Sequence, residues 1–148
     1  MAHYAFLDEN NIVQAVYVGI DENDLTELPE GYDSWESYYS FIKGMTCKRT
    51  SYNTVANTHT DGGTPFRGNY ASIGSIYDEV NDVFYPVKEY NSWLISEESN
   101  WTYYPPISKP ELTEEQISLN HFYAWDEDLY QADTNNPKTQ GWVIVTEH

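Results

Sequence analysis

The amino-acid sequence predicts a mainly β fold, in which successive antiparallel β-hairpins form a small sheet or sandwich with one or two short helices. The main observation is a recurring pattern: a run of aromatic or β-branched residues, a polar turn rich in Asp, Asn, Glu or Ser, and a second such run. The runs suit a pleated, half-buried surface, whereas the turn residues form local side-chain hydrogen bonds. Phe, Trp and Tyr also make up 16% of the chain, which favours a folded protein over a disordered acidic one.

The pattern marks the segments that we expect to form hairpins. The first runs from Tyr4 to Val18 around the turn at residues 8–11, and two more cover residues 74–87 and 92–104. A fourth, looser copy begins at Tyr123 and returns at Val145. The pattern contains no chemically reactive group, so it favours a protein that presents or covers a surface.

Two segments have helical rather than strand-like features. The apolar residues between Tyr32 and Gly44 recur near helical spacing, which predicts a helix near residues 34–43 with Ser34 as its cap. A second short helix is predicted within residues 112–121, where Thr113 can cap the start.

The remaining segments predict one further strand, an ordered loop and a linker. Residues 46–53 alternate as a strand does, and residues 57–69 are dense in Gly, Pro, Asn and Thr. We expect a β-rich main domain at 1–106, which includes the helix, and a proline-led linker with the C-terminal hairpin at 107–148. The linker prolines are Pro105, Pro106 and Pro110.

The charge of the chain argues against two classes of partner. Seven Lys and Arg residues against 24 Asp and Glu residues give a formal net charge of −17. This charge repels phosphate, so we expect neither nucleic-acid binding nor docking to an anionic membrane. No signal peptide and no long apolar run is visible, so we expect synthesis and folding in the cytoplasm of the cell that makes the protein.

The sequence gives little support to catalysis, cofactors or metals. No nucleophile elbow, phosphate loop or dinucleotide fingerprint occurs, so we expect no enzyme, no catalytic residue and no cofactor. A metal site at His59 and Asp61, or calcium in the acidic turns, is the less favoured alternative to solvated loops. The single cysteine, Cys47, excludes an intrachain disulfide, and we expect it to be a small buried or half-buried side chain.

Aromatic residues are the candidates for contact with other proteins, because Tyr and Trp combine apolar area with a polar group. Core filling is the alternative for each aromatic residue. Arg67, one of few basic residues, lies beside Phe66, and a structural ion pair is its alternative role. The candidate interaction residues are Phe66, Arg67, Tyr70, Trp93, Trp101, Trp125 and Trp142.

Four motifs occur in a fixed order between Thr50 and Pro105: TSYN, a Gly-rich loop with Arg and NYA, IG-x-x-YD, and SW…W…P. With the opening MAHYAFLDENNIV, this order resembles small uncharacterised proteins of tailed bacteriophages that infect marine and cyanobacterial hosts. The resemblance covers about two thirds of the chain and implies a phage setting. The chain departs from that pattern in a reduced proline element at residues 86–90 and an insertion between Trp125 and Trp142. The insertion reads as an extended hairpin tip or as a contact loop.

These observations lead to one preferred function and several alternatives. We expect a non-enzymatic virion protein that binds the outside of the particle, most simply as a capsid decoration subunit. The alternatives are a tail or tail-fibre accessory protein and a tail-fibre assembly chaperone that is absent from the mature particle. An enzyme acting on cell-wall sugar is less favoured. The expected partners are other phage capsid or tail proteins, with self-association left open.

Overall fold

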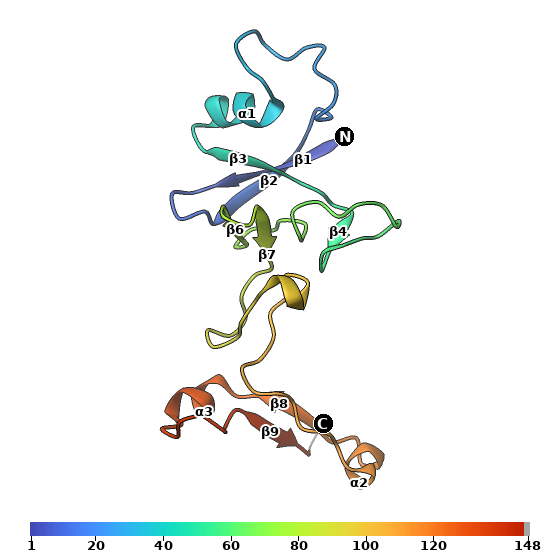
Figure 1. Ribbon diagram of the computed structural model, residues 1–148, viewed down its shortest axis with the longest axis vertical. Helices are drawn as coiled ribbons and strands as arrows, with labels where there is room; N and C mark the ends of the chain where they lie inside the picture. The colour runs from blue at the N-terminus through green and yellow to red at the C-terminus, as the bar shows by residue number, and fades with distance from the viewer. Residues whose placement is uncertain (147–148) are drawn as a thin grey trace. The chain divides into compact units, whose positions relative to one another are not determined.

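The computed structural model describes residues 1–146 and is mainly β, with small antiparallel sheets and short helices, as predicted (Figure 1). The strands are β1 (Ala2–Leu7), β2 (Val13–Gly19), β3 (Thr46–Thr50), β4 (Thr54–Val55), β5 (Thr58–His59), β6 (Ile76–Asp78), β7 (Val83–Tyr85), β8 (Phe122–Trp125) and β9 (Trp142–Val145). The helices are α1 (Trp35–Lys43), the 3₁₀ helix η1 (Glu97–Ser99), α2 (Glu114–Ser118) and α3 (Glu127–Ala132).

The chain forms two compact units. Unit 1 comprises Met1–Lys88 and Ile95–Tyr103, and unit 2 comprises Glu89–Leu94 and Tyr104–His148. Both units therefore contain two separate stretches of chain. The division into domains at 1–106 and 107–148 stays a prediction.

A three-stranded antiparallel sheet with the order β2-β1-β3 forms the centre of unit 1. The predicted first hairpin is confirmed, because β1 pairs with β2 from Ala2–Gly19 to Leu7–Val13. Asp8 stabilises the turn of this hairpin, because its carboxylate accepts hydrogen bonds from the N–H groups of Asn10 and Ile12. The predicted strand within 46–53 is β3, which covers residues 46–50 and pairs with the other side of β1.

Both faces of this sheet are covered, which explains the apolar character of β1. Successive side chains of a strand point to opposite faces. Tyr4 and Phe6 pack under α1 with Trp35 and Cys47, whereas Ala5, Leu7 and Val13 pack with Ala71, Tyr77 and Phe84. Figure 1 shows α1 and the β6–β7 hairpin on opposite sides of the sheet.

Local signals in the sequence set the bounds of α1, and the predicted helix is confirmed. The Ser34 side chain accepts a hydrogen bond from the Ser37 N–H and caps the first turn. Gly44 ends the helix in a left-handed conformation with φ of 68°, and its N–H donates to the Ser40 carbonyl.

Two short hairpins follow β3 in unit 1. The predicted hairpin within 74–87 is confirmed by the pairing of β6 with β7. Within the predicted loop at 57–69, β5 pairs with β4 through a tight turn in which Ala56 and Asn57 have positive φ angles. Buried Asn69 holds these parts together, because its amide donates to the carbonyls of Phe84 and Trp101.

The prediction of a hairpin over residues 92–104 is wrong. The segment has a single bridge between Leu94 and Tyr104, and η1 occupies its middle. Ser99 and Thr102 hydroxyl groups donate to backbone carbonyls three residues away, at 2.9 Å and 2.6 Å. These local bonds satisfy backbone groups that a strand ladder would otherwise pair.

Unit 2 contains the predicted C-terminal hairpin, in which β8 pairs with β9 from Phe122–Val145 to Trp125–Trp142. The predicted helix α2 is confirmed, and Thr113 and Gln116 form a reciprocal capping box at its start. A third helix, α3, lies in the insertion, where the sequence predicted only a tip or a loop. Asp126 caps α3 by accepting a hydrogen bond from the Leu129 N–H.

Candidate interaction surface

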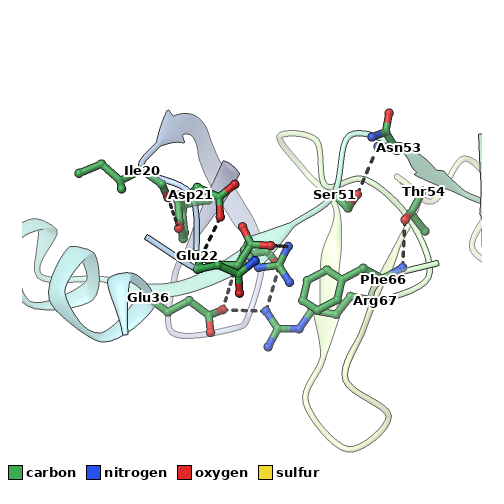
Figure 2. A network of polar contacts seen from close by, with 12 residues as sticks. Ile20, Asp21, Glu22, Glu36, Ser51, Asn53, Thr54, Phe66 and Arg67 are labelled. Carbon is green, nitrogen blue, oxygen red and sulfur yellow. Dashed lines mark hydrogen bonds and ion pairs between the residues drawn. The ribbon is translucent and has the colours of Figure 1, made fainter. Parts of the chain in front are cut away.

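Arg67 lies at the centre of an ion-pair network within unit 1 (Figure 2). Its Nη1 lies 2.7 Å from Glu36 Oε2 of α1 and 2.9 Å from the Arg49 carbonyl oxygen, and its Nε lies 2.8 Å from Asp82 Oδ1. Burial lowers the pKa of Arg67, but the hydrogen bond to Glu36 and the charges of Glu36 and Asp82 outweigh it, so the pKa is raised. Arg67 thus has the structural ion pair that the sequence analysis gave as its alternative role.

Phe66 connects this network to β3. The guanidinium of Arg49 lies 3.8 Å from the centroid of the Phe66 ring, and that of Arg67 lies 4.8 Å from it. The Phe66 N–H donates to Thr54 Oγ1 over 3.0 Å (Figure 2). Both guanidinium groups form cation–π contacts with the half-buried Phe66 ring, so Phe66 makes contacts within the protein.

Tyr70 and Trp101 occupy different places in unit 1. Tyr70 meets His3 edge to face at 5.5 Å and Tyr52 at 6.2 Å, and the Tyr52 side chain is exposed. Trp101 is buried and stacks on Tyr85 at 5.9 Å. Of these two predicted residues, Tyr70 belongs to an aromatic group that reaches the surface, whereas Trp101 belongs to the interior.

The other three predicted tryptophans meet in unit 2. The ring centroids of Trp125 and Trp142 lie 5.2 Å apart, and Trp93 lies 6.0 Å from Trp125 and 6.4 Å from Trp142. Gly141 permits this approach, because a Cβ atom there would lie 2.5 Å from ring carbons of Trp125. Edge-to-face aromatic contacts and burial stabilise such a cluster, which acts as the apolar centre of a small unit.

A single carboxylate organises the chain around these tryptophans. Glu127 accepts hydrogen bonds from the Ser92 N–H and hydroxyl, from Trp125 Nε1 at 2.9 Å and from Gln131 Nε2 at 2.7 Å. Burial raises the pKa of Glu127, but these donors outweigh it and lower the pKa to about 2. Glu127 therefore ties residues 89–94 to β8 and α3 as an ionised group.

The two outer edges of the central sheet differ. The β3 edge is closed at Arg49, whose N–H donates to the Glu36 carboxylate and whose carbonyl oxygen accepts from Arg67. The start of the β2 edge is also covered, because the Val13 N–H donates to the Ser75 carbonyl oxygen over 2.8 Å. Within residues 1–146, no backbone hydrogen bond reaches residues 15–19 from any segment other than β1.

The open part of β2 was not among the predicted site residues. Its sequence, VQAVYVG, has no charge and no proline, although exposed edge strands commonly carry lysine or proline to prevent pairing. Tyr17 is 53% exposed and Val18 is 57% exposed. The absence of charged residues from this strand could have been noticed in the sequence as a sign of an unprotected edge. Only the sheet order, however, shows that β2 is an edge strand.

The basic side chains face the protein's own aromatic rings. Lys43, Lys48, Lys88 and Lys138 each lie 4.9–5.8 Å from the centroid of a tyrosine ring. Together with Arg49 and Arg67 on Phe66, six of the seven basic residues have such a partner. These contacts leave the charges unchanged, and the 24 Asp and Glu residues outnumber the seven basic ones, so the net charge attracts basic partners.

Residues 1–146 contain no group of three or more His, Cys, Asp or Glu side chains placed to hold a metal ion. Among the same residues, no helix has the length and apolar character needed to cross a membrane. Comparison of the chain with protein-family models, curated proteins and solved structures finds no match.

Proposed function

We propose that this chain is a non-enzymatic bacteriophage structural protein that binds the outside of the virion, as a capsid decoration or accessory subunit. The observation that carries the proposal is the open, uncharged edge of β2 at residues 15–19. Such an edge offers backbone donors and acceptors to a strand of another protein, and its side chains offer specificity. The phage setting comes from the sequence motifs between Thr50 and Pro105.

The charge distribution supports a role in assembly on a larger particle. A net charge of −17 keeps the free subunit soluble and prevents the open edge from pairing freely with other copies. The partners we propose are capsid or tail proteins that present a surface of opposite charge. The subunit is made in the host cytoplasm and then joins the virion.

The proposal is tested by quantitative mass spectrometry of gradient-purified phage particles. The copy number of this polypeptide is compared with the copy numbers of the major capsid and tail subunits. We expect a high and fixed copy number, and the ratio separates capsid decoration from a tail or tail-fibre accessory role. Abundant expression in infected cells together with absence from particles would overturn the proposal and favour an assembly chaperone.

A further inference from the structure

We propose that a polar cavity in unit 1 binds a neutral sugar ring. The cavity has a volume of about 200 Å³ and lies where the start of β1 meets the end of β3 and the segment that follows β2. This site goes beyond the proposed function, because none of its lining residues belongs to the open edge at residues 15–19. The lining residues that carry the argument are His3, Asp21, Glu22, Arg49, Tyr52 and Asn53.

The size and polarity of the cavity limit the ligand to about one hydrophilic ring. Pockets for drug-sized ligands measure about 300–1,000 Å³. A cavity of about 200 Å³ is smaller, so it holds a small ligand or one unit of a longer one. Its lining is mainly polar, and burying these groups against an apolar ligand would leave them without hydrogen bonds. A ligand rich in hydroxyl groups therefore suits the cavity.

The lining offers both acceptors and donors of hydrogen bonds. One carboxylate oxygen of the exposed Asp21 accepts from the Asn23 N–H over 2.9 Å, so the other oxygen can accept from a ligand. The amide oxygen of Asn53 accepts from the Thr60 hydroxyl over 3.5 Å, so its amide nitrogen can donate to a ligand. A hydroxyl group both donates and accepts, so neighbouring hydroxyl groups on one sugar ring match this lining.

The charges of the lining favour a neutral ligand. Arg49 Nη1 lies 3.2 Å from Glu22 Oε1, and the Arg49 guanidinium lies 3.8 Å from the centroid of the Phe66 ring, so both contacts hold this group in place. An anionic ligand would compete with Glu22 for Arg49 and would be repelled by Asp21. A cationic ligand would be repelled by Arg49. A neutral ring avoids both costs.

An exposed aromatic ring provides the apolar part of the site. Tyr52 is 66% exposed, and its ring stacks on His3 with the centroids 5.7 Å apart. The same ring meets Tyr70 edge to face at 6.2 Å, so two neighbours fix its position. A sugar ring has faces of C–H groups that pack against an aromatic ring while its hydroxyl groups bind polar side chains. Tyr52 beside Asp21 and Asn53 matches both kinds of sugar surface.

The inference is tested by NMR titration of the full-length protein with small sugars. The probes are the methyl glycosides of glucose, galactose and mannose, which are neutral hexose rings. Each is compared with the uronic acid and the amino sugar of the same ring, which carry a negative and a positive charge. Shifts of the backbone amide signals locate the binding site and give the dissociation constant.

We expect at least one neutral glycoside to bind with a Kd of about 1–10 mM and to shift the amide signals of His3 and residues 51–53. The two charged counterparts of that sugar should bind at least about fivefold more weakly, because each meets a like charge in the lining.

Two variants separate the aromatic and polar parts of the site. Tyr52→Ala removes the aromatic face and should weaken binding about fivefold. Asp21→Asn replaces a charged acceptor with a neutral one and should weaken binding about threefold. Both side chains are exposed, so the amide spectra of the variants should show an intact fold. Tyr104→Ala is the matched control, since Tyr104 is 39% exposed and lies in unit 2, and it should leave binding unchanged.

Four outcomes would overturn the inference. The first is no binding of any neutral glycoside up to about 50 mM, and the second is a set of shifts confined to residues outside the lining. The third is a charged counterpart that binds as tightly as the neutral sugar, and the fourth is a folded Tyr52→Ala variant with unchanged binding. The analysis of phage particles does not involve this cavity, so the sugar site and the virion role are tested independently.

Discussion

The clearest structural prediction concerns Glu36, which closes the β3 edge and binds Arg67. Its carboxylate accepts one hydrogen bond from the Arg49 N–H and one from Arg67 Nη1. The Glu36 side chain is 29% exposed and that of Arg67 is 12% exposed, so solvent screens the pair only partly. Glu36→Gln keeps an oxygen acceptor and the volume of the side chain but removes the charge.

The expected cost follows from these two bonds. A hydrogen bond to a charged group contributes about 1 kcal/mol more than a bond between neutral groups, so two such bonds give a loss of about 2 kcal/mol. For a unit of this size, that loss lowers the melting temperature by roughly 10 °C. Arg67 keeps its second partner, Asp82, which limits the loss.

The matched control is Glu22→Gln, which removes the same charge from an ion pair with Arg49. The Glu22 and Arg49 side chains lie 3.2 Å apart and are 36% and 22% exposed. A pair at the surface contributes little, so we expect a loss below about 0.5 kcal/mol.

The assay is urea unfolding followed through the reactivity of Cys47, the only cysteine, which is buried in unit 1. The thiol reports the unfolding of unit 1 without a signal from unit 2. A Glu36→Gln loss no larger than the Glu22→Gln loss would refute the reasoning, because it would show that the network contributes no more than a surface ion pair.

Three further predictions concern acid stability, thiol reactivity and packing. Four donors lower the pKa of Glu127 to about 2, so the stability that its carboxylate contributes is present above its ordinary pKa of 4.5 and is lost as the pH falls toward 2. Near-UV circular dichroism should show this loss of stability in acid. In the Glu127→Gln variant, the loss between pH 4.5 and 2 should be smaller. Burial raises the pKa of Cys47 to about 12, so its reaction with a disulfide reagent at pH 8 should be at least about 100-fold slower in the folded protein than in urea, and equal rates would contradict its burial. Gly141→Ala places a Cβ atom 2.5 Å from Trp125 ring carbons and should cost about 1–3 kcal/mol in thermal unfolding, so an unchanged midpoint would contradict the close approach.

Several elements of this fold could be predicted from the sequence because their determinants are local. The first hairpin follows from alternating side chains and from Asp8, which binds backbone groups within four residues of itself. Helix α1 follows from Ser34 at its start and Gly44 at its end. Local signals also explain the error at residues 92–104, where serine and threonine hydroxyl groups bind nearby carbonyls instead of permitting a strand ladder.

The candidate site depends on residues that are distant in the chain, so its organisation could not be predicted in the same way. Arg67 lies 31 residues after Glu36, and Glu127 lies 35 residues after Ser92. Seven interaction candidates were chosen by residue type, yet three of them form the centre of unit 2 and Trp101 is buried in unit 1. Composition alone does not separate an aromatic residue in a core from one at a surface.

The sequence by itself determined the acidic charge, the class of fold and most local elements, because these depend on composition and on neighbours along the chain. Only the tertiary structure decided which sheet edge is closed and which is open. The strand β1 lies between β2 and β3, and Glu36 and Arg67 reach β3 from other segments. Strand β2 keeps an open edge because, within the described part of the chain, only β1 forms backbone hydrogen bonds with residues 15–19.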